Sequence, residues 1–136
     1  MSDDRTRAEI GALLAVYNAA ADAVDLDRFV DCFTHDATFD FVNEGLCYSG
    51  TEQLRAMLAG SSRAGVHRTE LLDVEGGAEQ VRVSSRLTEL RRDTGELFRT
   101  GTYDDTVRRD GDCWRFTSRR LTYELGRLDR PQEVAR

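Results

Sequence analysis

The residues best suited to proton transfer in this chain are few. Of 136 residues only two are histidines, His35 and His67, and imidazole is the side chain that titrates near neutral pH. All 19 basic residues are arginines, which excludes a lysine Schiff base and a phosphate-binding lysine. A histidine held by a carboxylate could act as a general base, because the carboxylate fixes its tautomer and stabilises the imidazolium that forms.

Other kinds of chemistry find little support in the residue types and their spacing. The cysteines are odd in number, far apart and in no CxxC spacing, which indicates neither a disulfide framework nor a zinc site. We expect reduced and mostly packed thiols at Cys32, Cys47 and Cys113. No nucleophile elbow precedes a helix, so a Ser-His-Asp triad is not indicated. Acid–base chemistry without a metal or other cofactor remains.

Three helices and a series of strands are expected to position these groups. Apolar residues at helical spacing predict a helix over 6–24, a second over 25–33 that Asp25 caps, and a third over 50–58 with Thr51 as its N-cap. Alternating patterns predict short strands over 37–42 and 46–48. Four long strands, separated by Gly-containing turns, are expected at about 66–74, 78–92, 97–109 and 113–125.

These elements predict an α+β fold in which a curved antiparallel sheet folds around the N-terminal helices. The long strands form a meander, and only the helices are available to cover one face of it. The length fits a single domain, residues 1–125. The tail, 126–136, contains the only proline, Pro131, and little apolar surface. We expect this tail to be frayed or docked on a partner subunit.

The net charge and the hydropathy of the sequence indicate which classes of binding partner to expect. The formal net charge is −6, and the arginines are scattered, which argues against nucleic acid as a partner. No segment approaches the ~20 apolar residues that a membrane span requires, and the N-terminus lacks the pattern of a signal peptide. We therefore expect a cytoplasmic protein that does not bind membranes.

Several short motifs occur in an order that resembles a known family. They are Tyr17, Asp22, Phe33-Thr-His-Asp-Ala, Tyr48-Ser-Gly, His67, Gly101-Thr-Tyr103 and Asp110-Gly-Asp-Cys-Trp114. Over residues 8–124 the chain resembles the SnoaL-like branch of the NTF2-like superfamily. The resemblance implies a cone-shaped α+β barrel with an apolar pocket at its open end, in a dimer or trimer. A fold does not by itself imply a reaction.

Within that superfamily the pattern is similar to the group of scytalone dehydratase and hexachlorocyclohexane dehydrochlorinase. The resemblance implies that His67, on the first long strand, pairs with Asp22 at the end of the first helix. It also implies that Arg119 enters the pocket from the last strand. Tyr17 would assist as a hydroxyl donor. We expect further pocket contacts from aromatic residues, namely Phe39, Phe41, Tyr48 and Tyr103.

Each of these residues also has a purely structural interpretation. His67 could be a hydrogen-bonded structural group, and Asp22 could cap or solvate its helix end. Tyr17 could be a core tyrosine, and Tyr103 could pack on the sheet. Arg119 could be a surface charge, because strand alternation places it opposite Trp114 and Phe116 unless a bulge intervenes.

We therefore predict a cofactor-independent acid–base enzyme of the dehydratase, lyase, cyclase or isomerase type. Its substrate would be a small, mostly apolar metabolite, and the resemblance to SnoaL-like proteins implies a polyketide-type or aromatic compound, as in natural-product biosynthesis. One alternative is a module of the same fold that binds small molecules or assembles without catalysis. Another is an enzyme like the epoxide hydrolases, with Arg86, Asp104 and Asp105 as the residues to test.

Overall fold

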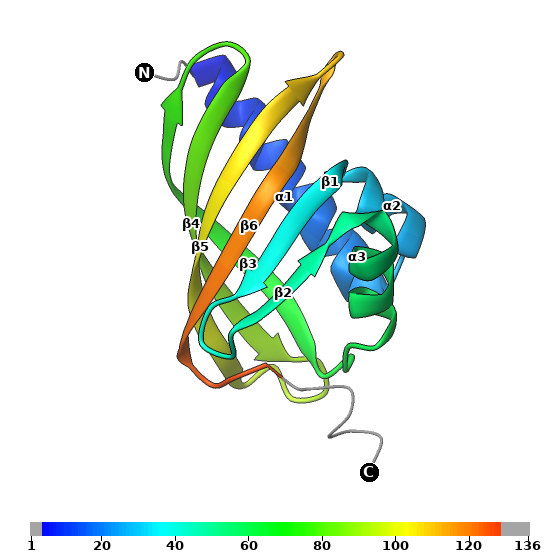
Figure 1. The fold of residues 1–136 in the computed structure, drawn as a ribbon. Helices are drawn as coiled ribbons and strands as arrows, with labels where there is room; N and C mark the ends of the chain where they lie inside the picture. The colour runs from blue at the N-terminus through cyan, green and yellow to red at the C-terminus, as the bar shows by residue number, and fades with distance from the viewer. Residues whose placement is uncertain (1–3, 129–136) are drawn as a thin grey trace.

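The computed structural model describes residues 4–128, which form three helices and six strands. The apolar stripe, the Asp25 cap and the Gly-containing turns produce the expected elements in the expected order (Figure 1). Their bounds are α1 Asp4–Ala23, α2 Leu26–Asp31, β1 Phe33–Phe41, β2 Leu46–Ser49, α3 Gly50–Ala59, β3 Gly65–Gly76, β4 Gln80–Arg91, β5 Leu97–Asp110 and β6 Cys113–Leu125.

The α1 helix lies in the concave side of the sheet, and its apolar stripe supplies the contact. Ile10, Leu14 and Tyr17 are buried on this stripe. The helix ends where Val24 adopts a left-handed conformation, with φ of 52°. The amide of the next residue, Asp25, donates back to the carbonyl of Ala20 at 2.9 Å, so the chain turns sharply after α1. The Asp25 side chain then accepts from the Arg28 amide and caps α2, as predicted.

The six strands form one curved sheet in the order β2-β1-β6-β5-β4-β3. β3, β4, β5 and β6 are joined by antiparallel hairpins, which confirms the predicted meander. β1 pairs with β6 in parallel, a contact between distant segments that turn signals do not reveal. The α+β class with helices against a curved sheet is confirmed. Within residues 4–128 this curved sheet stays open between β2 and β3.

Two local expectations are wrong. The first strand begins at Phe33 rather than at residue 37, so His35 is an exposed residue within this strand. Pairing with β6 extends the strand, because Phe33 lies in register with Phe116. The third helix is capped at Ser49 rather than at Thr51. The Ser49 amide donates to the side-chain oxygen of Gln53 at 2.7 Å, so a residue of the helix satisfies the N–H group of the cap residue.

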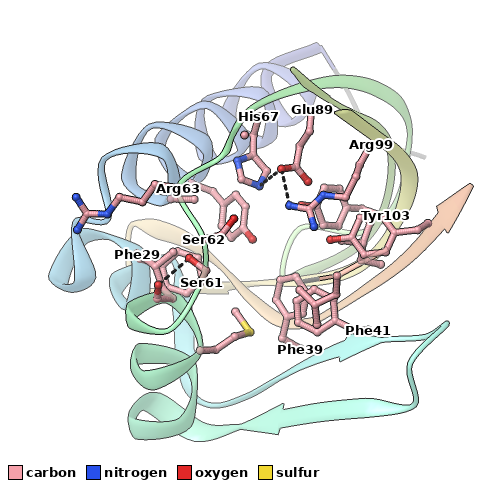
Figure 2. Close-up of a pocket in the computed structure, with 18 of the residues that line it drawn as sticks. Phe29, Phe39, Phe41, Ser61, Ser62, Arg63, His67, Glu89, Arg99 and Tyr103 are labelled. Atoms are coloured by element: carbon pink, nitrogen blue, oxygen red, sulfur yellow. Dashed lines mark hydrogen bonds and ion pairs between the residues drawn. The ribbon is translucent and has the colours of Figure 1, made fainter. Parts of the chain in front are cut away.

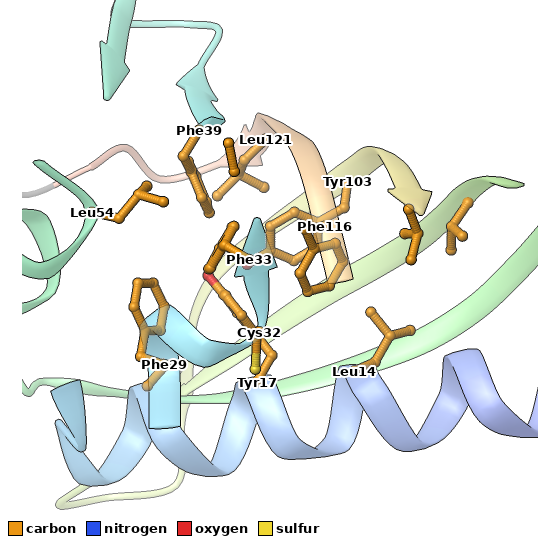
Figure 3. Packing of buried hydrophobic residues seen from close by; sticks show 14 of the residues in the cluster. Leu14, Tyr17, Phe29, Cys32, Phe33, Phe39, Leu54, Tyr103, Phe116 and Leu121 are labelled. Atoms are coloured by element: carbon orange, nitrogen blue, oxygen red, sulfur yellow. The ribbon is translucent and has the colours of Figure 1, made fainter. Parts of the chain in front are cut away.

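Aromatic side chains dominate the core between α1 and the sheet. Tyr17 makes ring contacts with Phe29, Phe33, Phe116 and Tyr103 at centroid distances of 5.2 to 6.4 Å (Figure 3). The three cysteines are free. Only one of them, Cys32, is buried, so the expectation of packed thiols is wrong for Cys47 and Cys113.

The expected frayed or docked tail falls mainly on residues 129–136, which lie outside the described part of the chain. The described residues after β6 pack back on the domain. The Leu128 amide donates to Glu44 at 3.2 Å, and the Leu128 side chain packs against the core.

Candidate active site

His67 and Asp22 meet where the last turn of α1 crosses the first residues of β3. The Nδ1 atom of His67 lies 2.6 Å from Oδ1 of Asp22. The backbone amide of His67 also donates to the same carboxylate, at 3.0 Å to Oδ1 and 3.2 Å to Oδ2. A carboxylate only accepts hydrogen bonds, so this network assigns the ring proton to Nδ1 and leaves a lone pair on Nε2.

Two further contacts hold the end of α1 against the sheet. Arg92, just after β4, donates to the backbone carbonyl of Asp22 at 2.6 Å. Asn18, one turn before Asp22, donates to the hydroxyl of Thr69 on β3 at 3.1 Å. Both partners of the His67–Asp22 contact are therefore fixed by their own elements. The side chains remain partly accessible, with 22% of His67 and 19% of Asp22 exposed.

His67 lines a pocket of about 90 Å³ between the sheet, α1 and α3. Figure 2 shows Phe39 and Phe41 on one side of it, with His67, Glu89 and Arg99 on the other. The pocket thus has an aromatic wall and an ionic wall. Other lining residues include Tyr17, Tyr48, Met57, Leu58, Tyr103, Leu121, Tyr123 and Leu128.

Glu89 and Arg99 form a buried ion pair in the ionic wall. Nη2 of Arg99 lies 3.0 Å from Oε2 of Glu89, and only 2% of the Glu89 side chain is exposed. The same Oε2 lies 4.0 Å from Nε2 of His67. Sequence reasoning missed this pair, although a signal was present. Glu89 continues the inward-facing alternation of Val81 and Val83 along β4.

Tyr17 and Tyr103 bring two hydroxyl groups to the inner end of the pocket. Burial raises the pKa of Tyr17 to about 12 and that of Tyr103 well above its ordinary value. The positive charge of the neighbouring Arg119 is the largest effect that opposes the rise in the pKa of Tyr17. Both phenols are therefore protonated at neutral pH, and each has a proton that it can donate.

Arg119 is fully buried, so its interpretation as a surface charge is wrong. The β5–β6 register shifts between Phe116 and Ser118, and this bulge brings Arg119 to the same side of β6 as Phe116. Its guanidinium donates twice to the carboxylate of Asp105, at 2.9 and 3.0 Å. Its Cζ atom lies 3.6 Å from the ring centre of Tyr103 and 4.4 Å from that of Tyr17.

Arg119 therefore lies behind the tyrosines that line the pocket, beside a carboxyl group of unusual basicity. Burial raises the pKa of Asp105 to about 6, against the opposing attraction of Arg119. Among the described residues the pocket lining does not include Arg119 or Asp22. It does include the other predicted site residues, which are Tyr17, Phe39, Phe41, Tyr48, His67 and Tyr103. Their roles in catalysis or binding stay predictions.

The residues considered for epoxide hydrolysis do not meet in the pocket. Arg86 lies 3.5 Å from Glu124, and both side chains are half exposed. Asp104 is exposed, while Asp105 is occupied by Arg119. Within residues 4–128 no group of three or more His, Cys, Asp or Glu side chains could hold a metal ion. In the same range no helix is long and apolar enough to cross a membrane.

Comparison with known proteins agrees with this architecture. A family model described as a SnoaL-like domain matches residues 4–120. The chain belongs to the SnoaL-like family. The resemblance inferred from the motifs is thereby confirmed. No curated protein sequence matches the chain.

Solved structures share the fold of this SnoaL-like protein at low sequence identity. A protein with a cystatin-like fold from Nostoc punctiforme has a TM-score of 0.81 and 22% identity, covering 90% of this chain and 93% of the other. Rv3472 from Mycobacterium tuberculosis has a TM-score of 0.79 and 26% identity, with coverage of 88% and 72%. A candidate scytalone dehydratase from Novosphingobium aromaticivorans has a TM-score of 0.77 and 19% identity, with coverage of 88% and 85%.

Proposed function

We propose that this SnoaL-like protein is a cofactor-independent acid–base enzyme of the dehydratase, lyase, cyclase or isomerase type. Its substrate is a small, mostly apolar metabolite of polyketide type. The observation that carries the proposal is the 2.6 Å contact between His67 and Asp22 at the wall of an apolar pocket. A base, its orienting carboxylate and a binding cavity occur together there.

The first step is removal of a proton from a carbon next to a carbonyl group. Nε2 of His67 takes the proton, and Asp22 stabilises the imidazolium through Nδ1. The electron pair of the C–H bond moves to the carbonyl oxygen, which becomes an enolate. The hydroxyl of Tyr17 or Tyr103 can donate to this oxygen, because both phenols remain protonated at neutral pH.

The second step sets the type of reaction. In a dehydration the enolate re-forms the carbonyl, the C–O bond to a β-hydroxyl group breaks, and the imidazolium proton leaves with that hydroxyl as water. In an isomerisation the same proton returns to another carbon. In a cyclisation the enolate carbon attacks a second carbonyl, and its oxygen takes the proton. Each path restores neutral His67.

The surroundings of His67 support proton transfer from a weak carbon acid. The pocket walls include Phe39, Phe41, Leu58 and Leu121, which exclude water from an apolar substrate. In such surroundings charges interact more strongly than in bulk water. Membership of the SnoaL-like family is compatible with this class of chemistry, and the candidate scytalone dehydratase has the same fold.

The experiment that tests the proposal needs no knowledge of the natural substrate. The α-hydrogens of 1-tetralone, 2-tetralone and 1-indanone exchange with deuterium when a base removes them, and NMR in D₂O measures the rate. We expect the protein to accelerate exchange of at least one of these ketones. His67→Gln should lower the rate by about a hundredfold or more.

His35→Gln is the matched control. His35 is exposed on β1, and this substitution removes the other imidazole of the chain. It should leave the exchange rate unchanged. Ketone binding without any acceleration would instead favour the module that binds without catalysis. Equal loss in both variants would contradict a special role for His67.

The expected assembly and location belong to the same proposal. We propose a homodimer or homotrimer in the cytoplasm with no nucleic-acid or membrane partner. Light scattering on the purified chain should give a mass of two or three times 15.3 kDa.

A further inference from the structure

Glu89 is a buried carboxylate that the proposed reaction does not use. It lies on β4 directly across from His67 on β3, and 2% of its side chain is exposed. Figure 2 shows it beside His67 and Arg99 at the ionic wall of the pocket. A buried carboxylate is costly unless partners compensate its lost hydration.

The surrounding structure is built to hold this carboxylate in place. Arg99 compensates its charge with a contact of 3.0 Å to Oε2. Arg99 is itself fixed, since its Nη1 donates to the carbonyl of Arg127 at 2.8 Å. The first residue of β3, Gly65, has no side chain, and a Cβ atom there would collide with Oε2 of Glu89. The strand thus leaves room for the carboxylate.

The position of Glu89 relative to His67 indicates what it binds. Because the Nδ1–H group of His67 donates to Asp22, Nε2 presents a lone pair to the pocket. Oε2 of Glu89 is an anionic acceptor only 4.0 Å away, too far for a direct hydrogen bond. Nε2 of His67 and Oε2 of Glu89 are thus two acceptors that face the same space. They favour a ligand that directs one hydrogen toward each of them. One hydrogen is the acidic C–H that His67 removes.

We propose that Glu89 selects substrates that carry a hydroxyl group beside the carbon that loses its proton. The hydroxyl donates to the Glu89 carboxylate, while the apolar body of the substrate lies against Phe39 and Phe41 on the opposite wall. The substrate class is therefore hydroxylated aromatic or cyclic ketones, including their enols and phenols. The choice of reacting carbon rests on the proposed function of His67, whereas recognition of the hydroxyl does not.

Binding of two isosteric probes tests this specificity. 2-Naphthol carries a hydroxyl where 2-methylnaphthalene carries a methyl group, and the fluorescence of either probe reports its dissociation constant. Because hydrogen bonds to charged groups are among the stronger ones, we expect Glu89→Gln to weaken 2-naphthol binding at least about tenfold and to leave 2-methylnaphthalene binding nearly unchanged. The measured quantity is the ratio of the two dissociation constants, compared between each variant and the wild type. The difference in hydrophobicity between the probes therefore cancels.

Glu124→Gln is the matched control, because Glu124 lies on β6 and its half-exposed side chain pairs with Arg86 rather than with a pocket residue. It should change neither dissociation constant. Should Glu89→Gln fail to fold, Gly65→Ala and Glu89→Asp give the same test. Gly65→Ala displaces the carboxylate by steric contact, and Glu89→Asp shortens the side chain so that the carboxylate lies farther from the ligand. Both variants retain the negative charge. Each should weaken 2-naphthol binding selectively.

The proposal is overturned if all Glu89 and Gly65 variants retain the wild-type preference for 2-naphthol. It is also overturned if His67→Gln removes the preference while Glu89→Gln preserves it, since the hydroxyl would then bind His67. Loss of deuterium exchange is a separate readout. Selective naphthol binding without exchange would preserve the role of Glu89 and reject the acid–base function.

Discussion

At the scale of single residues, the proposed function assigns the hydroxyl of Tyr17 the role of stabilising an enolate that His67 would generate. Burial raises its pKa to about 12, so it is a hydrogen-bond donor across the neutral range. We expect Tyr17→Phe to lower the rate of ketone exchange by about a hundredfold, as loss of one such donor does elsewhere. The measurement is the deuterium exchange assay at constant protein concentration.

Tyr48→Phe is the control for Tyr17→Phe, since Tyr48 also lines the pocket but comes from the short strand β2. It should retain most of the activity. An equal loss in the two variants would show that any pocket hydroxyl matters and that Tyr17 has no distinct role.

The buried carboxyl of Asp105 makes stability depend on pH. Its native pKa is raised to about 6 by burial, from an ordinary value of 3.8. The native state therefore holds this proton more tightly than the unfolded state. The resulting stabilisation is complete below about pH 4 and is lost as the pH rises through about 6.

Asp105→Asn removes this titration. Relative to the variant, the wild-type free energy of unfolding should fall between pH 4 and pH 6, as measured by urea denaturation at several pH values. Asp104→Asn, the same change at the exposed neighbour, should retain the wild-type pH dependence. If the free energy of unfolding depends on pH in the same way for wild type and Asp105→Asn, the pKa of Asp105 is the same in the native and unfolded states, which contradicts the prediction.

Sequence reasoning located single residues only where pattern or family resemblance pointed to them. His67 and Asp22 came from the resemblance, and the structure places them 2.6 Å apart. Glu89 was missed although strand alternation already turned it inward, because a charge on an inward position is easily discounted. The partner that makes its burial tolerable, Arg99, lies on another strand, and its approach depends on tertiary structure.

At the scale of elements, the short helix α2 depends on its cap. It has six residues, and Asp25 accepts from the Arg28 amide at 3.2 Å. We expect Asp25→Ala to lower the free energy of unfolding by about 1 kcal/mol, because the first turn loses a hydrogen-bond acceptor. Urea denaturation measures the change.

Asp27→Ala provides the comparison on the same helix. Its side chain is 88% exposed and pairs with Arg55 at the surface, a type of contact that contributes little. The expected loss is within about 0.5 kcal/mol. A larger effect at Asp27 than at Asp25 would contradict the capping assignment.

Helices and hairpins were predictable because their signals are local. Apolar spacing indicated α1, and turn sequences separated β3, β4, β5 and β6. The parallel pairing of β1 with β6 was not predictable in this way, because it joins segments that are distant in sequence. The bulge near Ser118 was also hidden, and it decides which side of β6 carries Arg119. Bulge positions follow from the twist and pairing of the whole sheet.

At the scale of the whole molecule, the pocket exists only in the folded chain, since its walls come from distant segments. Phe39 comes from β1, His67 from β3 and Leu128 from the segment after β6. A ligand that binds only the native state stabilises it by mass action. At a concentration of 100 times its dissociation constant, 2-naphthol should add about 2.7 kcal/mol and raise Tm by several degrees.

Differential scanning calorimetry with increasing 2-naphthol checks this prediction. 2-Naphthalenesulfonate, which would bring a permanent anion beside Glu89, serves as the comparison and should have a smaller effect. An unchanged Tm under saturating 2-naphthol would contradict binding to the folded pocket.

The overall class of the molecule and the curvature of its sheet could be predicted, whereas the sequence does not indicate whether the outer strands pair. The numbers of helices and long strands follow from composition and periodicity, and helices must cover one face of such a sheet. Whether the outer strands meet depends on accumulated twist and on the packing of α1 and α3. In the described chain the sheet is curved, as predicted, and it stays open between β2 and β3.

The most direct test of the His67–Asp22 pair compares ketone exchange rates of four proteins, namely wild type, Asp22→Asn, His67→Gln and the double variant. An asparagine at position 22 can donate to Nδ1, which moves the ring proton to Nε2 and removes the base. We predict that each single variant loses most of the activity and that the double variant loses little more. Full exchange activity in Asp22→Asn, or losses that multiply in the double variant, would contradict a single proton-transfer unit.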